Sequence, residues 1–198
     1  MATITKTVGA ALLSLQSIAS NTVVISSAQD VSTKLSATVL IHFGRRATTA
    51  LTEGMEFRVE ASGKSTGDGH WFPLAVFKTA TATAETEAVT GTVAAGATVI
   101  TVASTTNLTV ADMIYIDNTT IANSEWGYIK AVSANTSVTI EDALVNAQTG
   151  STLYDQAEVF VAQLDLTAVT RLRLVANGDN TGQAVAVEAW LVTGDSIG

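Results

Sequence analysis

Alternation of apolar and polar side chains predicts β-strands along much of this chain, because successive side chains of a strand point to opposite faces. The clearest case is Leu35–Phe43, in which every second residue from Leu35 onward is apolar. Met55–Ala61 follows the same rule and places Glu56, Arg58 and Glu60 on its polar side. Further strands of this kind are expected at Ala10–Gln16, Trp71–Lys78, Glu158–Leu166, Arg171–Ala176 and Ala184–Val192.

Turn-forming residues separate these strands. Ser62–Gly69 is rich in Gly, Ser and Asp and predicts a hairpin loop, and Asn177–Gly182 predicts a second turn. Pro73 lacks the N–H that a central strand needs, so Trp71–Lys78 is expected at a sheet edge or at a bulge.

The middle of the chain has a different pattern. Thr79–Thr90 is almost entirely Ala, Thr and Glu, with little to bury. After it, short apolar segments recur with turn residues between them, which is typical of a small barrel or sandwich. These short strands are expected at Thr98–Ala103, Met113–Asp117, Trp126–Val132 and Ser137–Glu141.

The change of pattern predicts an insertion. We expect an all-β protein whose main domain, residues 1–84 plus 155–198, is a β-sandwich or jelly-roll-like fold. Residues 85–154 would form a small β-barrel-like module inserted at a loop of that domain. One continuous sandwich with short middle strands is the alternative.

Composition supports the β assignment and narrows the function classes. The chain has 198 residues, 31 of them Thr, and 47% are hydrophobic. Thr and Val suit strands better than helices. A net charge of −8 argues against nucleic acid as a partner, and no apolar run is long enough to span a membrane as a helix. Without cysteine there is no disulfide and no thiolate chemistry.

No catalytic motif is complete. The sequence at 63–66, Gly-Lys-Ser-Thr, resembles the end of a P-loop motif. The earlier glycine and the following helix of that motif are missing, so a hairpin loop is favoured. Asp68, His70 and Trp71 form the most enzyme-like cluster, yet no serine sits in a nucleophile elbow. His42 is expected to be a cross-strand or contact residue. We therefore predict no catalytic residues and no enzyme activity.

Metal and cofactor sites are not expected either. The two histidines are 28 positions apart, which does not fit a zinc site. Glu141 and Asp142 are neighbours and would face opposite sides of a strand. Oxygen ligands for calcium are available on loops, but none has calcium-loop spacing, so turn capping is favoured. Those candidates are Asp112, Asp117, Asn118, Asp179 and Asn180.

Aromatic residues raise one further possibility. Trp71, Trp126 and Trp190 would suit a sugar-binding face, although core packing also accounts for them.

The short-strand region resembles β-modules of structural proteins of tailed bacteriophages. The resemblance rests on an apolar strand after a Gly turn at 96–102 (GATVITV), an apolar strand after an acidic turn at 111–116 (ADMIYI), and a Gly-led strand at 150–154 (GSTLY). The segments Ser14–Ser27 and Ala157–Ile197 also look like particle proteins. Within that group the chain is most similar to head decoration, or cement, proteins.

This resemblance implies a virion protein that binds the outer capsid surface and stabilises the shell. Its partner would be the major capsid protein, and it would be a homo-oligomer, a trimer or dimer, without a cofactor. It would assemble in the host cytoplasm and reside on the capsid surface. A tail, baseplate or fibre component, or a host-glycan-binding β-module, is the alternative.

The N-terminal strands are candidates for an inter-subunit contact. Ile4–Thr7 and Ala10–Gln16 are apolar enough to add to a sheet edge, either of this protein or of a neighbouring subunit.

Overall fold

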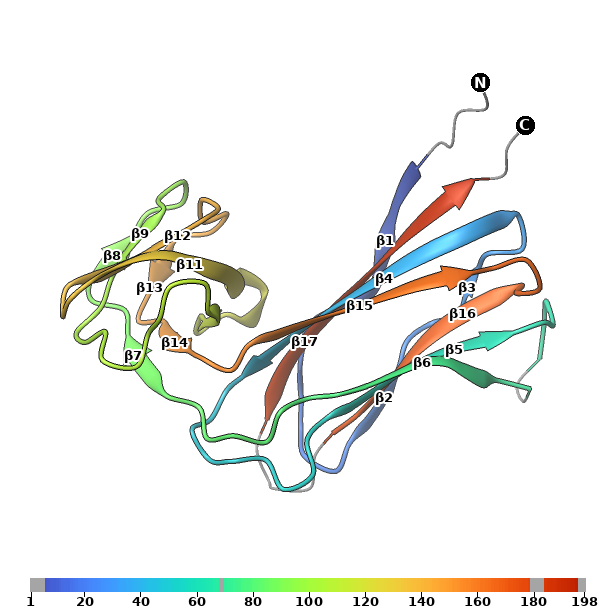
Figure 1. Cartoon of the computed structure of the whole chain (residues 1–198), viewed down its shortest axis with the longest axis horizontal. Helices are drawn as coiled ribbons and strands as arrows, with labels where there is room; N and C mark the ends of the chain where they lie inside the picture. Colours follow the sequence, from blue (N-terminus) through green and yellow to red (C-terminus); the bar gives the residue numbers. More distant parts are fainter. Residues whose placement is uncertain (1–5, 68–69, 179–183, 196–198) are drawn as a thin grey trace.

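The computed structural model describes residues 6–67, 70–178 and 184–195. Within these residues the chain is built from β-strands, and its helical structure is a single 3₁₀ turn, η1 (Ile121–Asn123). The predicted all-β class is therefore confirmed. None of the helical structure in the described ranges has the length and apolar character required to cross a membrane. Figure 1 shows two lobes, a larger one built from the first and last parts of the described chain and a smaller one built from its middle.

Two antiparallel sheets form the larger lobe. Sheet A has four strands in the described residues, in the order β1 (Lys6–Ile18), β17 (Val185–Asp195), β4 (Lys34–Arg45) and β15 (Glu158–Asp165). Sheet B has the order β2 (Val23–Ile25), β16 (Arg171–Asn177), β5 (Glu56–Ser62) and β6 (Phe72–Lys78), with β3 (Gln29–Asp30) also paired to β16.

The alternation read from the sequence sets the core between these sheets. Val39, Ile41 and Phe43 of β4 are completely buried, as are Phe57 and Val59 of β5. Leu35 departs from the predicted apolar face, because it lies at the open start of β4 and is 45% exposed.

Aromatic rings join the two sheets. Phe57 of β5 meets Phe43 of β4 edge-on, with ring centroids 6.4 Å apart. Phe160 of β15 lies 5.7 Å from Phe57 and 5.3 Å from Phe77 of β6. Such tilted pairs add to the stability gained from burial alone. The larger lobe is thus a sandwich with one shared core, as predicted.

A six-stranded sheet forms the smaller lobe within the described residues. Its order is β7 (Thr86–Ala88), β14 (Thr152–Tyr154), β10 (Met113–Asp117), β11 (Glu125–Ser133), β12 (Ser137–Ile140) and β9 (Val99–Thr101). A short pair, β8 (Thr92–Val93) with β13 (Gln148–Thr149), lies beside it. The isolated bridge Val89–Val102 brings the two sheet edges together, so the sheet curls around its own core, which includes Ile100, Ile114 and Ile129.

Several short elements differ from the sequence expectations. The Ala/Thr/Glu stretch, expected to bury little, contains β7 and the buried residues Ala84 and Val89. The sequence pattern did not reveal this strand, because its side chains are small and its pairing depends on backbone hydrogen bonds. The pairs involving β2, β3, β8 and β13 are only two or three residues long, too short for a period of two to be visible. The boundaries proposed for the inserted module, residues 85–154, stay a prediction.

The N-terminal strand pairs within the chain. β1 is hydrogen-bonded to β17 from Lys6 to Ile18, with several register shifts. Of the two partners considered for this segment, the protein's own sheet is the one that the structure shows, and residues 4 and 5 lie outside the described residues.

The lobes meet around the end of β4. Gly44 faces the ring of buried Tyr115 so closely that a Cβ on Gly44 would lie 2.4 Å from the Tyr115 Cγ. Next to it, the Arg46 Nε donates to both carboxylate oxygens of Asp117, at 3.0 and 3.1 Å. The Tyr154 hydroxyl donates to the Arg46 carbonyl at 3.2 Å. Burial raises the pKa of Tyr115 well above its usual value, so its hydroxyl stays protonated and donates to Asp117.

The two chain segments that connect the lobes run side by side. The Asp155 N–H donates to the Glu85 carbonyl at 3.2 Å, and the Glu85 N–H donates to the Asp155 carboxylate at 2.7 Å. Glu158 accepts the Ala80 N–H at 2.8 Å. Burial raises the pKa of Glu158, and this outweighs the opposing effects of the Ala80 N–H and of Arg45.

We expect Gly44→Ala to destabilise the protein by about 1–3 kcal/mol, because the added methyl group overlaps the Tyr115 ring. Thermal or urea unfolding measures the change. Gly63→Ala is the matched control, since the nearest atom to a Cβ there is 3.6 Å away, and it is expected to change stability by less than about 0.5 kcal/mol. Equal stability of the two variants would contradict the contact.

Glu158→Gln is expected to stabilise the protein at pH 7. A carboxyl whose pKa is raised by folding binds its proton more tightly in the folded state, so stability falls as pH rises through that range. Gln removes this loss and keeps an acceptor for the Ala80 N–H. The difference in unfolding temperature from the parent should shrink below about pH 4, measured by calorimetry. Glu158→Ala removes the acceptor and should destabilise; a Gln variant less stable than the parent at pH 7 would contradict the argument.

Candidate functional site

The outer face of sheet B is the first candidate surface. Its two edge strands carry exposed apolar side chains: Val23 and Ile25 on β2 are 54% and 53% exposed, and Val76 on β6 is 53% exposed. Phe72 and Leu74 of β6 are also exposed. We call the outward residues of β2, β16, β5 and β6, together with Trp71 just before β6, the sheet B face.

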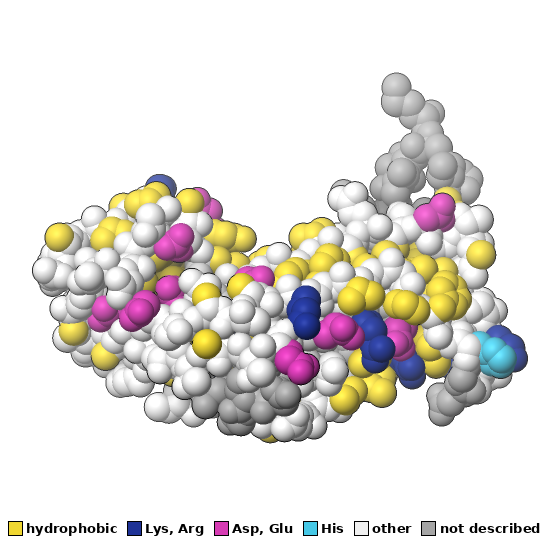
Figure 2. All heavy atoms as spheres, turned by 60° about the horizontal axis from the view of Figure 1, so that its bottom comes forward, with side chains coloured by type: hydrophobic (Ala, Val, Ile, Leu, Met, Phe, Trp, Pro, Cys, Tyr) yellow, Lys and Arg dark blue, Asp and Glu magenta, His cyan; other side chains and the backbone are white. Residues whose placement is uncertain are grey.

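Charged residues lie between the two apolar edges of this face. Arg173 of β16 binds Glu60 of β5 through two nitrogens, at 2.7 and 2.9 Å from the same carboxylate oxygen. Arg58 lies 3.6 Å from carboxylate oxygens of both Glu56 and Glu60. Figure 2 shows basic and acidic side chains close together on the larger lobe, with hydrophobic side chains on both sides of them. The charges are thus largely compensated within the chain.

Trp71 belongs to one end of the sheet B face rather than to the core. The guanidinium groups of Arg173 and Arg171 lie over its ring, 4.2 and 4.9 Å from the centroid. Arg171 also donates to the carbonyls of Lys64 and Gly67. Residues 63–66, which resemble the end of a P-loop, therefore belong to the hairpin loop between β5 and β6, as predicted. Arg171 holds this loop in place.

The second candidate is a cleft between the lobes, with a volume of about 430 Å³. Sheet A contributes His42, Glu188 and Trp190 from its outer side, and β11 contributes Glu125 and Trp126. Its remaining lining residues are Leu15, Ala122, Ser124, Val145 and Asn146. Figure 2 shows that the outline of the molecule is indented between the lobes. We call this feature the interlobe cleft.

Hydrogen bonds hold the residues of the interlobe cleft in place. The Trp126 Nε1 donates to the Phe43 carbonyl at 3.1 Å, which links β11 to β4. The Trp126 ring lies 5.0 Å from that of Tyr115. The Glu125 carboxylate accepts the N–H groups of Val145 and Asn146, at 2.8 and 2.7 Å, so it shapes the loop that forms one wall.

His42 occupies a cross-strand position, as predicted. It lies opposite Glu188 in the register, and its Nδ1 is 3.8 Å from a Glu188 carboxylate oxygen. Its ring is 5.3 Å from that of Trp126. His42 and Trp126 also line a smaller hollow of about 170 Å³, together with Tyr128 and Asp142.

A hollow at the lobe connection gathers three carboxylates, Asp112, Asp155 and Glu158. Each carboxylate accepts a backbone N–H. Asp112 accepts that of Thr109 at 3.1 Å, and the other two accept those that fasten the connecting segments, from Glu85 to Asp155 at 2.7 Å and from Ala80 to Glu158 at 2.8 Å. No group of three or more potential ligands suited to a metal occurs within the described ranges. These carboxylates therefore have a structural use as caps of turns and connections.

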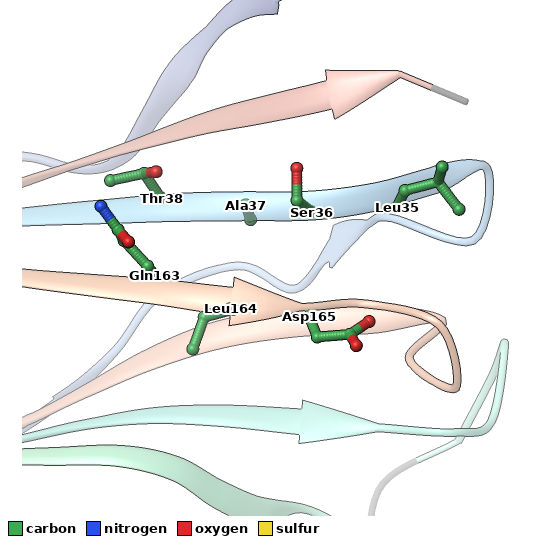
Figure 3. A pocket seen from close by; sticks show the side chains of 7 residues that line it. All are labelled: Leu35, Ser36, Ala37, Thr38, Gln163, Leu164 and Asp165. Carbon is green, nitrogen blue, oxygen red and sulfur yellow. The ribbon is translucent and has the colours of Figure 1, made fainter. Parts of the chain in front are cut away.

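A further hollow, of about 550 Å³, lies at the open end of sheet A, across β4 and β15. Figure 3 shows its lining residues along these two paired strands, where Ser36 lies opposite Asp165 and Thr38 opposite Gln163. Hydrogen bonds from Thr167 lower the pKa of Asp165, so this carboxylate stays ionised. Among the described residues that line this hollow, Asp165 is the one with an ionisable side chain, so the hollow offers no pair of ionisable groups for catalysis or metal binding.

The other residues considered from the sequence are dispersed. His70, at a positive φ of 75°, precedes β6, while Asp68 lies outside the described residues. Asp117 is paired with Arg46, and Asn118 accepts the Thr120 N–H at 2.9 Å, so it caps a turn as predicted. Asp179 and Asn180 also lie outside the described residues. Glu141 does not line the hollow that contains Asp142.

Sequence reasoning considered Trp71, Trp126 and Trp190 together but did not place His42 and Glu188 beside them. Trp71 lies at sheet B, under Arg173, whereas the interlobe cleft brings together Trp126 and Trp190. The two are 64 positions apart, and only the docking of the smaller lobe on sheet A brings them together. The one available signal was that Glu188 and Trp190 share the non-core side of a predicted strand.

Comparisons with known proteins give weak likenesses to viral proteins. No protein-family model and no curated protein matches the chain. Among solved structures, the tailspike protein gp49 of Pseudomonas phage LKA1 is 30% identical over 36% of this chain and 14% of its own, with a TM-score of 0.30. VP17, a capsid protein of bacteriophage P23-77, is 12% identical over 97% of this chain and 100% of its own, with a TM-score of 0.20. A chain of infectious bursal disease virus, Gx strain, is 10% identical over 98% of this chain and 40% of its own, with a TM-score of 0.27.

Proposed function

We propose that the protein is a non-enzymatic structural component of a virus particle, which binds the outer capsid surface and stabilises the shell. Its partner is the major capsid protein, and the sheet B face is the surface that contacts it. The observation that carries the proposal is the exposure of Val23, Ile25 and Val76 on both edges of one sheet face.

Exposed apolar side chains on one face favour a contact surface over a solvated one. Isolated exposed apolar residues are ordinary, but a group of them on one face is typical of a protein–protein interface. Here they flank a compensated set of charges, in which Arg58 and Arg173 pair with Glu56 and Glu60. Such charges set the orientation of a partner more than they add affinity.

The architecture suits a clamp on a shell. Both lobes consist of antiparallel strands with their own buried cores, and the contacts at Gly44 and Arg46 join them into one elongated unit (Figure 1). A unit of this kind can bridge neighbouring subunits. A net charge of −8 keeps an assembly that displays many copies soluble.

We expect the double variant Ile25→Asp/Val76→Asp to lose at least about tenfold in affinity for capsid shells prepared without this protein, because it places charge in the apolar edges of the contact. Co-sedimentation measures binding, and circular dichroism confirms folding. Val110→Asp is the matched control, since Val110 is 54% exposed but lies on the smaller lobe. Unchanged occupancy of the double variant would reject the sheet B face. Binding of the parent to tails and not to shells would reject the capsid assignment.

The proposal also has the protein act as a dimer or trimer. We expect sedimentation equilibrium of the full chain to give two or three times its monomer mass of 20.4 kDa at micromolar concentration. A mass of 20.4 kDa, that of the monomer, at micromolar concentration would contradict the predicted oligomer.

A further inference from the structure

We propose that the interlobe cleft is a binding site for a chain of neutral pyranose sugars. The site lies on the opposite side of the larger lobe's sandwich from the sheet B face, because its floor is the outer side of sheet A. The inference therefore stands independently of the docking role proposed above.

Aromatic faces supply the first part of the argument. Trp190 from β17 and Trp126 from β11 line the same cleft, and both are partly exposed. Tyr128, 43% exposed, lies two residues after Trp126 in β11, so both side chains leave the same face of that strand. The C–H face of a pyranose ring packs against the electron-rich face of such rings.

Hydrogen-bonding groups supply the second part. Glu188 lies in the interlobe cleft beside His42, and Asp142 lies in the adjoining hollow. Ionised carboxylates accept hydroxyl hydrogen bonds strongly. No Lys or Arg occurs among the described lining residues of either hollow, and His42 already faces the Glu188 carboxylate at 3.8 Å. A phosphate, a sialic acid or a uronic acid would therefore have no Lys or Arg partner there. Neutral sugars fit this chemistry, since they present hydroxyl donors and apolar faces together.

The choice of sugars over a cationic peptide rests on Glu125. Its carboxylate already accepts N–H groups from Val145 and Asn146 and from the Gln148 side chain, at 3.1 Å for the last. Its charge is thus largely satisfied within the wall of the cleft. Glu188 is left as the acidic group of the cleft best placed to meet a ligand, which favours a hydroxyl-rich molecule over one with several positive charges.

Size and preorganisation complete the argument. The volume of about 430 Å³ is in the range of small-molecule sites, and the adjoining hollow of about 170 Å³ shares His42 and Trp126 with it. A chain of two or more rings can therefore extend past Trp126. The hydrogen bond from Trp126 to the Phe43 carbonyl fixes one platform before the ligand arrives.

The test begins with an array of α- and β-linked gluco-, galacto- and manno-configured neutral oligosaccharides, with alginate hexamer and hexa-arginine as competing chemistries. The best neutral glycan is then titrated by tryptophan fluorescence and calorimetry against the full-length protein. We expect saturable binding to at least one neutral glycan and none to alginate hexamer. Trp190→Ala should weaken binding about tenfold or more, and Glu188→Gln several-fold.

Two control variants establish whether glycan binding depends on the interlobe cleft. Trp71→Ala removes an indole from the sheet B face and should leave glycan affinity unchanged, as should Ile25→Asp/Val76→Asp, whatever those changes do to shell binding. The inference is overturned if no neutral glycan binds below about 10 mM, if Trp190→Ala binds like the parent, or if hexa-arginine binds in place of sugars.

Discussion

The close approach of Gly44 to Tyr115 is the contact on which the arrangement of the two lobes depends. β4 crosses the centre of sheet A, and its inward side chains Val39, Ile41 and Phe43 build the sandwich core. At the end of the same strand, the absence of a side chain at Gly44 admits a buried ring of the smaller lobe. Packing at this density leaves no room for a methyl group, so the contact fixes the distance between the lobes.

That fixed distance creates the interlobe cleft. The partly exposed face of Trp126 is brought next to His42 and Glu188 because its indole N–H reaches the carbonyl of Phe43, one residue before Gly44. The buried phenol of Tyr115 and the ion pair between Arg46 and Asp117 complete the junction. Buried contacts and partly exposed side chains of the cleft thus lie within one small group of neighbouring residues.

The two faces of the larger lobe are chemically different, and this difference underlies the two proposals. The sheet B face combines apolar edges with paired charges such as Arg173 and Glu60, which suits a broad contact with another protein. The outer side of sheet A is covered in part by the smaller lobe and offers aromatic and carboxylate groups in a hollow. A particle protein with both could hold a shell on one side and meet surface sugars on the other.

The sequence by itself determined the strands whose side chains alternate, such as Leu35–Phe43 and Met55–Ala61, because a period of two records which side each residue faces. The sequence also determined that Pro73 lies in an edge strand. Pro73 pairs with Glu60, next to a register shift between Val59 and Glu60. The sequence did not determine the short pairs or the cleft. Two-residue pairs carry no period, and Trp126 and Trp190 become neighbours only through the docking of two separately folded cores, which depends on shape at Gly44 and Tyr115 rather than on any local pattern.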